Sequence, residues 1–168
     1  MIHSESLGEQ KKHEDFMEEA LALARLSMEQ NEGTPFGAVV VRNGKIIGKG
    51  RNKTLALFDP TAHSEVVAIR DACKNLRTLN LSDCILYASS EPCPMCMGAI
   101  YLTGIKQIFY TTSGKDAAAY GFMGLNLKHA IQDDFKSYGL QKESINREKG
   151  IQVFKEWKQH QVDRYLKW

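Results

Sequence analysis

Three side chains in two short stretches of the sequence form a potential zinc-binding set. His63 opens the triplet HSE at residues 63–65, and Cys93 and Cys96 stand in the segment PCPMC, 30 residues further along. One imidazole and two thiols are the ligands of a zinc site that keeps its fourth tetrahedral position for water. Glu65 is not needed as a ligand, and a carboxylate beside such a site is what general acid–base catalysis requires. The two stretches together predict a catalytic centre with one zinc ion per chain.

The alternatives to a catalytic zinc site fit the pattern less well. A C-x-x-C segment alone also occurs in redox motifs and in structural zinc sites. A structural site needs four protein ligands, and the remaining cysteines, Cys73 and Cys84, do not stand at a zinc-knuckle spacing. A redox role would not explain a histidine and a glutamate at the start of a helix. The combined pattern H-x-E…P-C-x-x-C is typical of zinc-dependent nucleobase deaminases.

The hydrophobic pattern places both halves of this motif at the beginning of helices. Thr61 is the expected N-cap of a helix that runs to about Leu76, which puts His63 in its first turn. Pro94 fits the first position of a second helix, at about residues 94–103. The thiolates then lie at or near a helix N-terminus, where the helix dipole favours negative charge.

The elements around the motif alternate between strands and helices. Asn43-Gly44 predicts a tight hairpin turn between two strands. The other expected elements are a helix at 14–30, strands at 36–41, 45–49, 84–88 and 106–110, a loop at 114–124, and helices at 126–137 and 146–165. This order predicts an α/β sandwich with helices packed on a mixed sheet.

Length and composition indicate one soluble domain over residues 1–168, since 43% of the chain is hydrophobic and 25% charged. No apolar run is long enough to span a membrane, and residues 1–16 lack the apolar core of a signal peptide, so we expect a cytoplasmic protein. The net charge is only +2. A nucleic-acid-binding domain is usually far more basic.

Four segments resemble the cytidine deaminase-like superfamily and, within it, the branch of bacterial guanine deaminases. They are PFGAVVVRNGKII, DPTAHSEVVAIRDACKNL, LSDCILYASSEPCPMCMGAIY and KDAAAYGF. The metal motif is typical of the whole superfamily, whereas DPTAH, GAIY behind the cysteines, and DAA-x-GF point to the guanine deaminase branch. The resemblance implies a three-layer α/β/α sandwich around a five-stranded mixed sheet. It also implies hydrolytic deamination of a small purine, most simply guanine to xanthine.

The same resemblance implies further site residues and an assembly. It places the substrate against six positions besides the metal motif and against one C-terminal aromatic residue, and it makes Glu65 the catalytic residue. The positions are Asn52, Phe36, Gly37, Ala62, Glu91, Asp116 and either Tyr165 or Trp168. Three of them also fit ordinary structural roles: Asn52 a turn residue, Phe36 a core residue and Asp116 a helix cap. A homodimer is expected, in which a C-terminal segment (about 126–168) is exchanged between subunits.

Other functions share these motifs. One alternative is a tRNA adenosine deaminase, which acts on a flipped base and is the only reading with a nucleic-acid partner. A deaminase of guanosine or another nucleoside is a second. A non-catalytic relative whose zinc only stabilises the fold is a third, and Glu65 argues against it because such a protein needs no proton shuttle.

Overall fold

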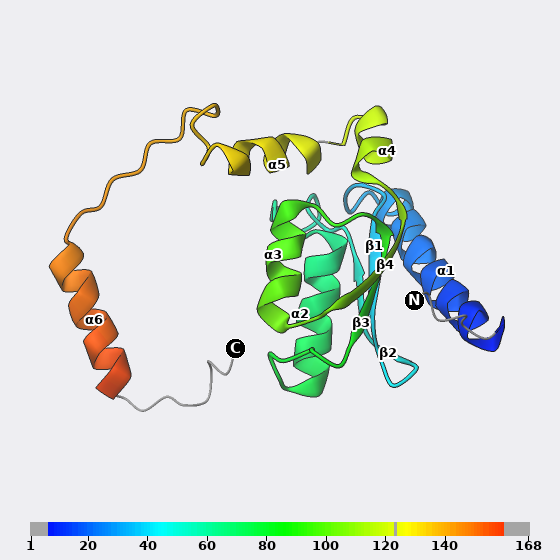
Figure 1. The fold of residues 1–168 in the computed structure, drawn as a ribbon. Coiled ribbons are helices and arrows are strands. Elements are labelled where there is room, and N and C mark those ends of the chain that lie inside the picture. Colours follow the sequence, from blue (N-terminus) through cyan, green and yellow to red (C-terminus); the bar gives the residue numbers. More distant parts are fainter. Residues whose placement is uncertain (1–6, 123, 160–168) are drawn as a thin grey trace, which may run out of the picture. The chain divides into compact units, whose positions relative to one another are not determined.

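A computed structural model describes residues 7–122 and 124–159 (Figure 1). The chain divides into two compact units, residues 1–128 and 129–168. The helices and strands are α1 (Leu7–Glu29), β1 (Gly37–Arg42), β2 (Lys45–Arg51), α2 (Ser64–Leu76), β3 (Ile85–Ser90), α3 (Pro94–Thr103), β4 (Gln107–Thr112), α4 (Gly114–Ala119), α5 (Gly124–Gln132) and α6 (Arg147–Gln159). No described helix is both long and apolar enough to cross a membrane.

The sheet is mixed, as expected, and its strand order is β2-β1-β3-β4. β1 pairs antiparallel with both β2 and β3, and β3 pairs parallel with β4. The expectation of five strands is wrong for the described residues, which contain four. The chain after β4 forms the helices α4, α5 and α6.

The β1–β2 hairpin forms where Asn43-Gly44 predicted it. Both residues have positive φ, 51° and 70°, as the favoured two-residue hairpin turn requires. The hairpin places the end of β2, and Asn52 after it, beside the start of β1. The Asn52 N–H donates to the Phe36 carbonyl at 2.9 Å.

Helices cover both faces of the sheet, with α1 on one face and α2 and α3 on the other (Figure 1). The apolar side chains of the strands alternate between the two faces. Val39 and Tyr87 pack under α1, and Val40 and Leu86 pack under α2. The sheet with α1, α2 and α3 therefore forms three layers.

Two glycines of β2 allow α2 to lie directly on the strand. A Cβ at Gly48 would stand 2.4 Å from the Ala68 carbonyl oxygen, and one at Gly50 would stand 2.0 Å from the Ser64 carbonyl oxygen. No side chain fits at such distances, so the close packing depends on glycine. Gly50 therefore sets the position of the first turn of α2.

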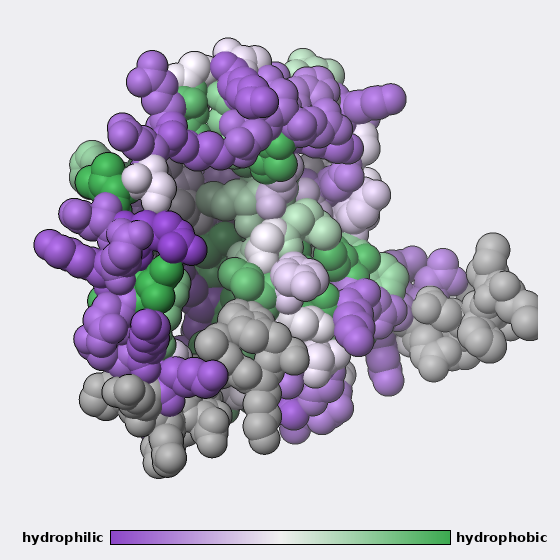
Figure 2. Space-filling model, turned by 60° about the vertical axis from the view of Figure 1, so that its left-hand side comes forward, coloured by the Kyte–Doolittle hydropathy of each residue, from purple (hydrophilic) through white to green (hydrophobic). Residues whose placement is uncertain are grey.

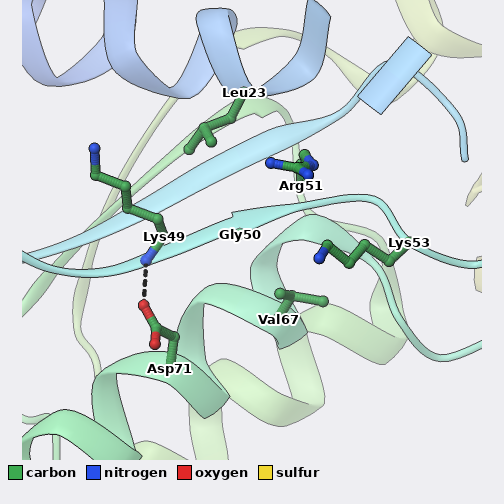
Figure 3. Close-up of a pocket in the computed structure, with 7 residues that line it drawn as sticks. All are labelled: Leu23, Lys49, Gly50, Arg51, Lys53, Val67 and Asp71. Carbon is green, nitrogen blue, oxygen red and sulfur yellow. Dashed lines mark hydrogen bonds between the residues drawn. The ribbon is translucent and has the colours of Figure 1, made fainter. Parts of the chain in front are cut away.

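The outer edge of β2 is a free sheet edge that α2 partly protects. Asp71 accepts the Lys49 N–H at 2.9 Å (Figure 3), and the Asn75 amide donates to the Ile47 carbonyl at 2.9 Å. A pocket of about 360 Å³ lies along this edge, between Leu23 of α1 and Val67 of α2.

The charges around this pocket are balanced. Lys49 pairs with Glu19, and Arg51 and Lys53 both pair with Glu32. The hydrogen bond from Arg51 holds the pKa of Glu32 below its usual value. An anionic ligand would find no free cation among these three side chains.

Several element boundaries differ from those expected from sequence. α1 begins seven residues earlier than the expected helix at 14–30, and the N-cap of α2 is His63, not Thr61. The expected loop at 114–124 contains α4. α6 is described from Arg147 to Gln159, so the end of the helix expected at 146–165 lies outside the described residues.

Candidate metal centre and active site

The three expected ligands stand at the N-termini of two neighbouring helices. His63 is the N-cap of α2 and Cys93 is the N-cap of α3, both with extended backbone. Neither side chain makes a capping hydrogen bond at its helix, although N-cap side chains often do. Pro94 occupies the first helical position, as expected, and Cys96 follows within the first turn. All three side chains are therefore directed to one another instead of to the helix ends.

The distances between the three ligand atoms match a tetrahedral zinc site. His63 Nδ1 lies 3.6 Å from Cys93 Sγ and 3.5 Å from Cys96 Sγ, and the two sulfurs are 3.7 Å apart. Zn–S bonds of about 2.3 Å and Zn–N bonds of about 2.0–2.1 Å at tetrahedral angles give edges of about 3.8 Å (S···S) and 3.6 Å (N···S). The residues present therefore fit a zinc ion without rearrangement.

The ligands are also tuned for binding a cation. The hydrogen bond with Cys96 and that with His63 lower the pKa of Cys93 to about 4, so this sulfur is a thiolate at neutral pH. The Cys93 thiolate in turn raises the pKa of His63. Cys93 and Glu65 raise the pKa of Cys96, because a second negative charge beside them is unfavourable without a metal. A zinc ion would neutralise this concentration of negative charge.

Glu65 lies in the first turn of α2 and is buried, with 7% of its surface exposed. Ser64 Oγ donates a 2.8 Å hydrogen bond to Glu65 Oε2 and so fixes one of its oxygens. Burial raises the pKa of the Glu65 carboxyl group. The carboxyl group in turn raises the pKa of Cys96, as expected of a group that lies beside the thiols. The carboxylate thus stands next to the ligand cluster without belonging to it.

The residues expected to contact substrate from the start of the sheet are partly structural. Asn52 is buried, with 2% exposed, and the Phe36 ring makes an edge contact with Phe122, the ring centroids 4.8 Å apart. A Cβ at Gly37 would stand 2.1 Å from the Ala20 carbonyl oxygen, so this glycine is required for packing β1 on α1.

The remaining expected contacts are also part of hydrogen-bonded structure. Ala62 is fully buried before His63, and its carbonyl accepts the Lys53 N–H at 2.9 Å. Glu91 is exposed and accepts the Gly114 N–H at 2.7 Å, which ties the start of α4 to the end of β3. Tyr165 and Trp168 lie outside the described residues.

Asp116 forms a capping box with Ser113 at the start of α4. Asp116 Oδ2 accepts the Ser113 N–H at 2.8 Å, and Ser113 Oγ accepts the Asp116 N–H at 3.2 Å. The Ser113 hydroxyl, which also donates to Asp116 Oδ2 at 2.6 Å, and the Ser113 N–H lower the pKa of Asp116, which is therefore ionised at neutral pH. The helix-cap role is present, and it uses only one of the two carboxylate oxygens.

Three residues at the site had no role assigned from sequence. Ser64 orients Glu65, Phe122 packs on Phe36, and Thr54 bonds to the Asn52 side chain. A hydroxyl beside the catalytic glutamate gave a signal for Ser64. Phe122 stood within the quoted DAA-x-GF segment, but its partner lies 86 residues away.

Comparison with known proteins places the chain in a family. Residues 10–112 match the cytidine and deoxycytidylate deaminase zinc-binding region. The guanine deaminase of Bacillus subtilis (strain 168) is 52% identical over 110 residues, 66% of this chain and 70% of that protein. A tRNA-specific adenosine deaminase of Aquifex aeolicus is 41% identical over 102 residues, 61% of this chain and 67% of that protein. The crystal structure of guanine deaminase from Bacillus subtilis has a TM-score of 0.85 at 40% identity and covers 92% of this chain and 99% of that chain.

The fold, the zinc-binding residues and these similarities agree. The chain belongs to the cytidine and deoxycytidylate deaminase zinc-binding family. It is a hydrolytic deaminase with a zinc cofactor, and the expected family is confirmed.

Proposed function

We propose that the protein hydrolyses guanine to xanthine and ammonia. The observation that carries this proposal is that three ligand atoms stand at the corners of a zinc coordination tetrahedron, with Glu65 beside them. The sequence similarity to a guanine deaminase selects the substrate. The deaminase motif alone would leave the base undetermined.

His63, Cys93 and Cys96 would hold the zinc ion. Zinc bound by such ligands lowers the pKa of water toward about 7 and so supplies a nucleophile at neutral pH. The three side chains form one face of the coordination tetrahedron. No other described side chain joins the group as a fourth ligand.

Glu65 would move the protons. It takes a proton from the attacking water and gives it to the ring nitrogen next to the amine-bearing carbon, which becomes tetrahedral as the oxygen adds. It then takes the proton of the new hydroxyl and gives it to the amine. Ammonia leaves, and the carbon keeps the oxygen as a carbonyl. The Ser64 hydroxyl orients this carboxylate by donating to one of its oxygens.

The purine would be bound between the end of β2 and the start of α4. Asn52 would bond to the base, and Phe36 with Gly37 would contact the ring from the start of β1. Ala62 and Glu91 would support the site from beside the zinc ligands. Asp116 would accept two neighbouring donors of guanine, the ring N–H and the exocyclic amine, which adenine does not offer as a pair. Tyr165 or Trp168 of a second subunit would close the site.

Adenosine deamination in tRNA is the second candidate, because a tRNA-specific adenosine deaminase is 41% identical to this chain. The two functions differ in charge requirements as well as in the base. A tRNA substrate needs a basic surface, and the net charge of this chain is only +2.

A homodimer with an exchanged C-terminal segment is the proposed assembly. α6 exposes Val153, Phe154 and Trp157 at helical spacing, an apolar face larger than a solvated helix needs. Apolar side chains also reach the surface on the face of the molecule shown in Figure 2. A second copy of the chain would cover such surfaces.

A substrate panel tests the proposal. Purified zinc-loaded protein is incubated with guanine, guanosine, adenosine, cytosine and an adenosine-containing tRNA, and ammonia release is measured. The proposal expects guanine to be the preferred substrate. Preferred release from the tRNA would favour the second candidate, and preferred release from guanosine would identify a nucleoside deaminase.

A further inference from the structure

Asn52 is held at three of its four hydrogen-bonding groups. Its N–H donates to the Phe36 carbonyl at 2.9 Å, and its carbonyl accepts a 2.6 Å bond from the buried Ser27 hydroxyl of α1. Its side-chain Oδ1 accepts from the Thr54 hydroxyl at 2.8 Å and from the Thr54 N–H at 3.2 Å. The backbone and the amide oxygen are thus fixed by neighbours from three different parts of the chain.

The bonds from Thr54 decide which way the amide faces. A backbone N–H only donates, so the Asn52 atom that faces the Thr54 N–H must be the oxygen. An amide rotated by 180° would place its NH₂ against that donor. The amide nitrogen Nδ2 is therefore the group that Asn52 presents outward.

Nδ2 is the one hydrogen-bonding group of Asn52 with open access. Among the described residues, only one side-chain nitrogen or oxygen is both fully buried and without a hydrogen-bond partner, and it is Asp133 Oδ1. Asn52 Nδ2 also has no partner among the described residues. It must therefore be accessible in part, although only 2% of Asn52 is exposed. A nearly buried donor with one open direction has the form of a ligand contact.

Gly33 makes room for this arrangement. A Cβ at Gly33 would stand 2.0 Å from Asn52 Oδ1 and 3.0 Å from Asn52 Cγ. The loop after α1 therefore packs directly against the amide oxygen, and only glycine leaves room for it there.

We propose that Thr54 is a positioning residue for substrate recognition, which holds Asn52 as a hydrogen-bond donor to the base. This inference rests on the proposed function. Asn52 then donates a hydrogen bond to an acceptor of the purine (N3, N7 or O6 of guanine). Its side chain cannot accept a hydrogen bond from the N–H or amine groups of the purine. The donors of guanine are left to a carboxylate elsewhere in the site. Discrimination among purines at Asn52 therefore depends on which acceptor the base carries.

Three substitutions test the positioning role. Thr54→Val keeps the shape and the backbone N–H but removes the hydroxyl donor, and Thr54→Ser restores that donor. The loss of a bond of about 1–2 kcal/mol corresponds to binding weakened roughly 5- to 30-fold in Thr54→Val, with recovery in Thr54→Ser. Thr78→Val removes a similar loop hydroxyl, which accepts the Asn80 N–H, and should leave binding unchanged.

The readout is the dissociation constant of each base, measured by calorimetry with Glu65→Gln in every protein so that no base is turned over. The bases are guanine and three analogues: 3-deazaguanine lacks N3, 7-deazaguanine lacks N7, and 2-aminopurine lacks O6 together with the N1–H donor. One of the three analogues lacks the acceptor that Asn52 binds. For that analogue, Asn52→Ala and Thr54→Val should no longer weaken binding, whereas both substitutions should still weaken the binding of the other two. A general loss of structure would weaken all four bases alike.

A second measurement needs no substrate. The ¹⁵N relaxation of the Asn52 side-chain amide should show a rigid group in the wild type and in Thr54→Ser, and a mobile one in Thr54→Val. If the amide stays equally rigid in Thr54→Val, or if Thr54→Val binds guanine as the wild type does, the proposal is wrong. If no purine binds while the relaxation result holds, the proposed function fails and the positioning of the amide stands.

Discussion

Three ligand atoms determine where chemistry can occur in this protein. His63 Nδ1 lies 3.5–3.6 Å from the two sulfurs, which are 3.7 Å apart, and these are the spacings of a zinc tetrahedron. The arrangement arises because two helices begin at the same point, and the N-cap residue of each contributes a ligand. The catalytic carboxylate follows two residues after the histidine, in the first turn of α2.

Removing either cysteine should remove the metal. Cys93→Ala and Cys96→Ala each leave two ligands, too few for a stable zinc site, so zinc content should fall from about one per chain to near zero and activity should be lost with it. Metal analysis of the purified variants checks this. Cys84→Ala is the matched control and should retain zinc, since Cys84 packs in the core away from the cluster. Full zinc occupancy in both ligand variants would exclude the assignment.

Glu65→Gln should separate proton transfer from metal binding. Gln preserves the shape of the side chain but does not take up a proton, so the variant should keep its zinc and lose about 10²–10⁴-fold in kcat. Ammonia release and zinc content are measured on the same preparation. Turnover at the wild-type rate would show that Glu65 is not the proton shuttle.

Asp116 and Ser113 distinguish a helix cap from a substrate contact. Ser113→Ala removes the cap and keeps the carboxylate, whereas Asp116→Asn removes the charge that would accept the two donors of guanine. We expect Ser113→Ala to lower stability by about 1 kcal/mol with kcat/KM little changed. Asp116→Asn should lower kcat/KM for guanine by orders of magnitude. Equal, small kinetic effects in both variants would leave Asp116 with the cap role alone.

Packing of α2 on β2 couples the sheet to the metal site. Gly50 lies under Ser64, and Ser64 follows His63 at the start of the helix. Any side chain at Gly50 must push the first turn of α2 away from the strand. The position of His63 therefore depends on a residue that contacts neither zinc nor substrate.

Gly50→Ala should weaken zinc binding as well as the fold. The added Cβ would meet the Ser64 carbonyl oxygen at 2.0 Å, so we expect a loss of about 1–3 kcal/mol in the free energy of unfolding and a lower zinc affinity. Gly98→Ala is the matched control. Gly98 lies exposed in α3 with no atom within 4 Å of the new Cβ, so this substitution should raise the free energy of unfolding by about 0.5–1 kcal/mol. Denaturant unfolding and zinc competition assays measure both effects. Wild-type zinc affinity in Gly50→Ala would contradict the coupling.

The sequence predicted the elements that carry local signals. Asn43-Gly44 predicted the hairpin and Pro94 the start of α3, because a turn and a helix start depend on neighbouring residues. α4 was missed although Ser113 and Asp116 stand at capping-box spacing, since the glycines at 114 and 121 favoured a loop. The anchoring of Asn52 could not be predicted, because the Ser27 hydroxyl that donates to its backbone carbonyl lies in α1, far from it in the sequence.

The chain as a whole combines a deaminase unit with a C-terminal unit, residues 129–168, in which none of the residues from 129 to 158 is fully buried. The described residues of α6 from 152 to 158 are all exposed, including three large apolar side chains. Burying them against a partner surface would release free energy. This is the physical argument for the proposed dimer.

Substitutions on α6 test that assembly. Phe154→Ser with Trp157→Ser should weaken the dimer and shift the mass toward that of one chain, whereas Lys155→Ser, a polar position between them, should leave the mass unchanged. Light scattering over a range of micromolar concentrations measures the mass. A wild-type protein that is monomeric throughout this range would overturn the proposed dimer.

Zinc-dependent conversion of guanine is the central claim, and one titration tests it. Metal-free protein receives zinc in steps from zero to two equivalents per chain, and xanthine formed from guanine is measured at each step. The predicted result is a rate that rises linearly with zinc and stops rising at one equivalent, with one ammonia released per xanthine. A zinc-saturated protein that forms no xanthine from guanine, or forms it equally well without zinc, would contradict the account.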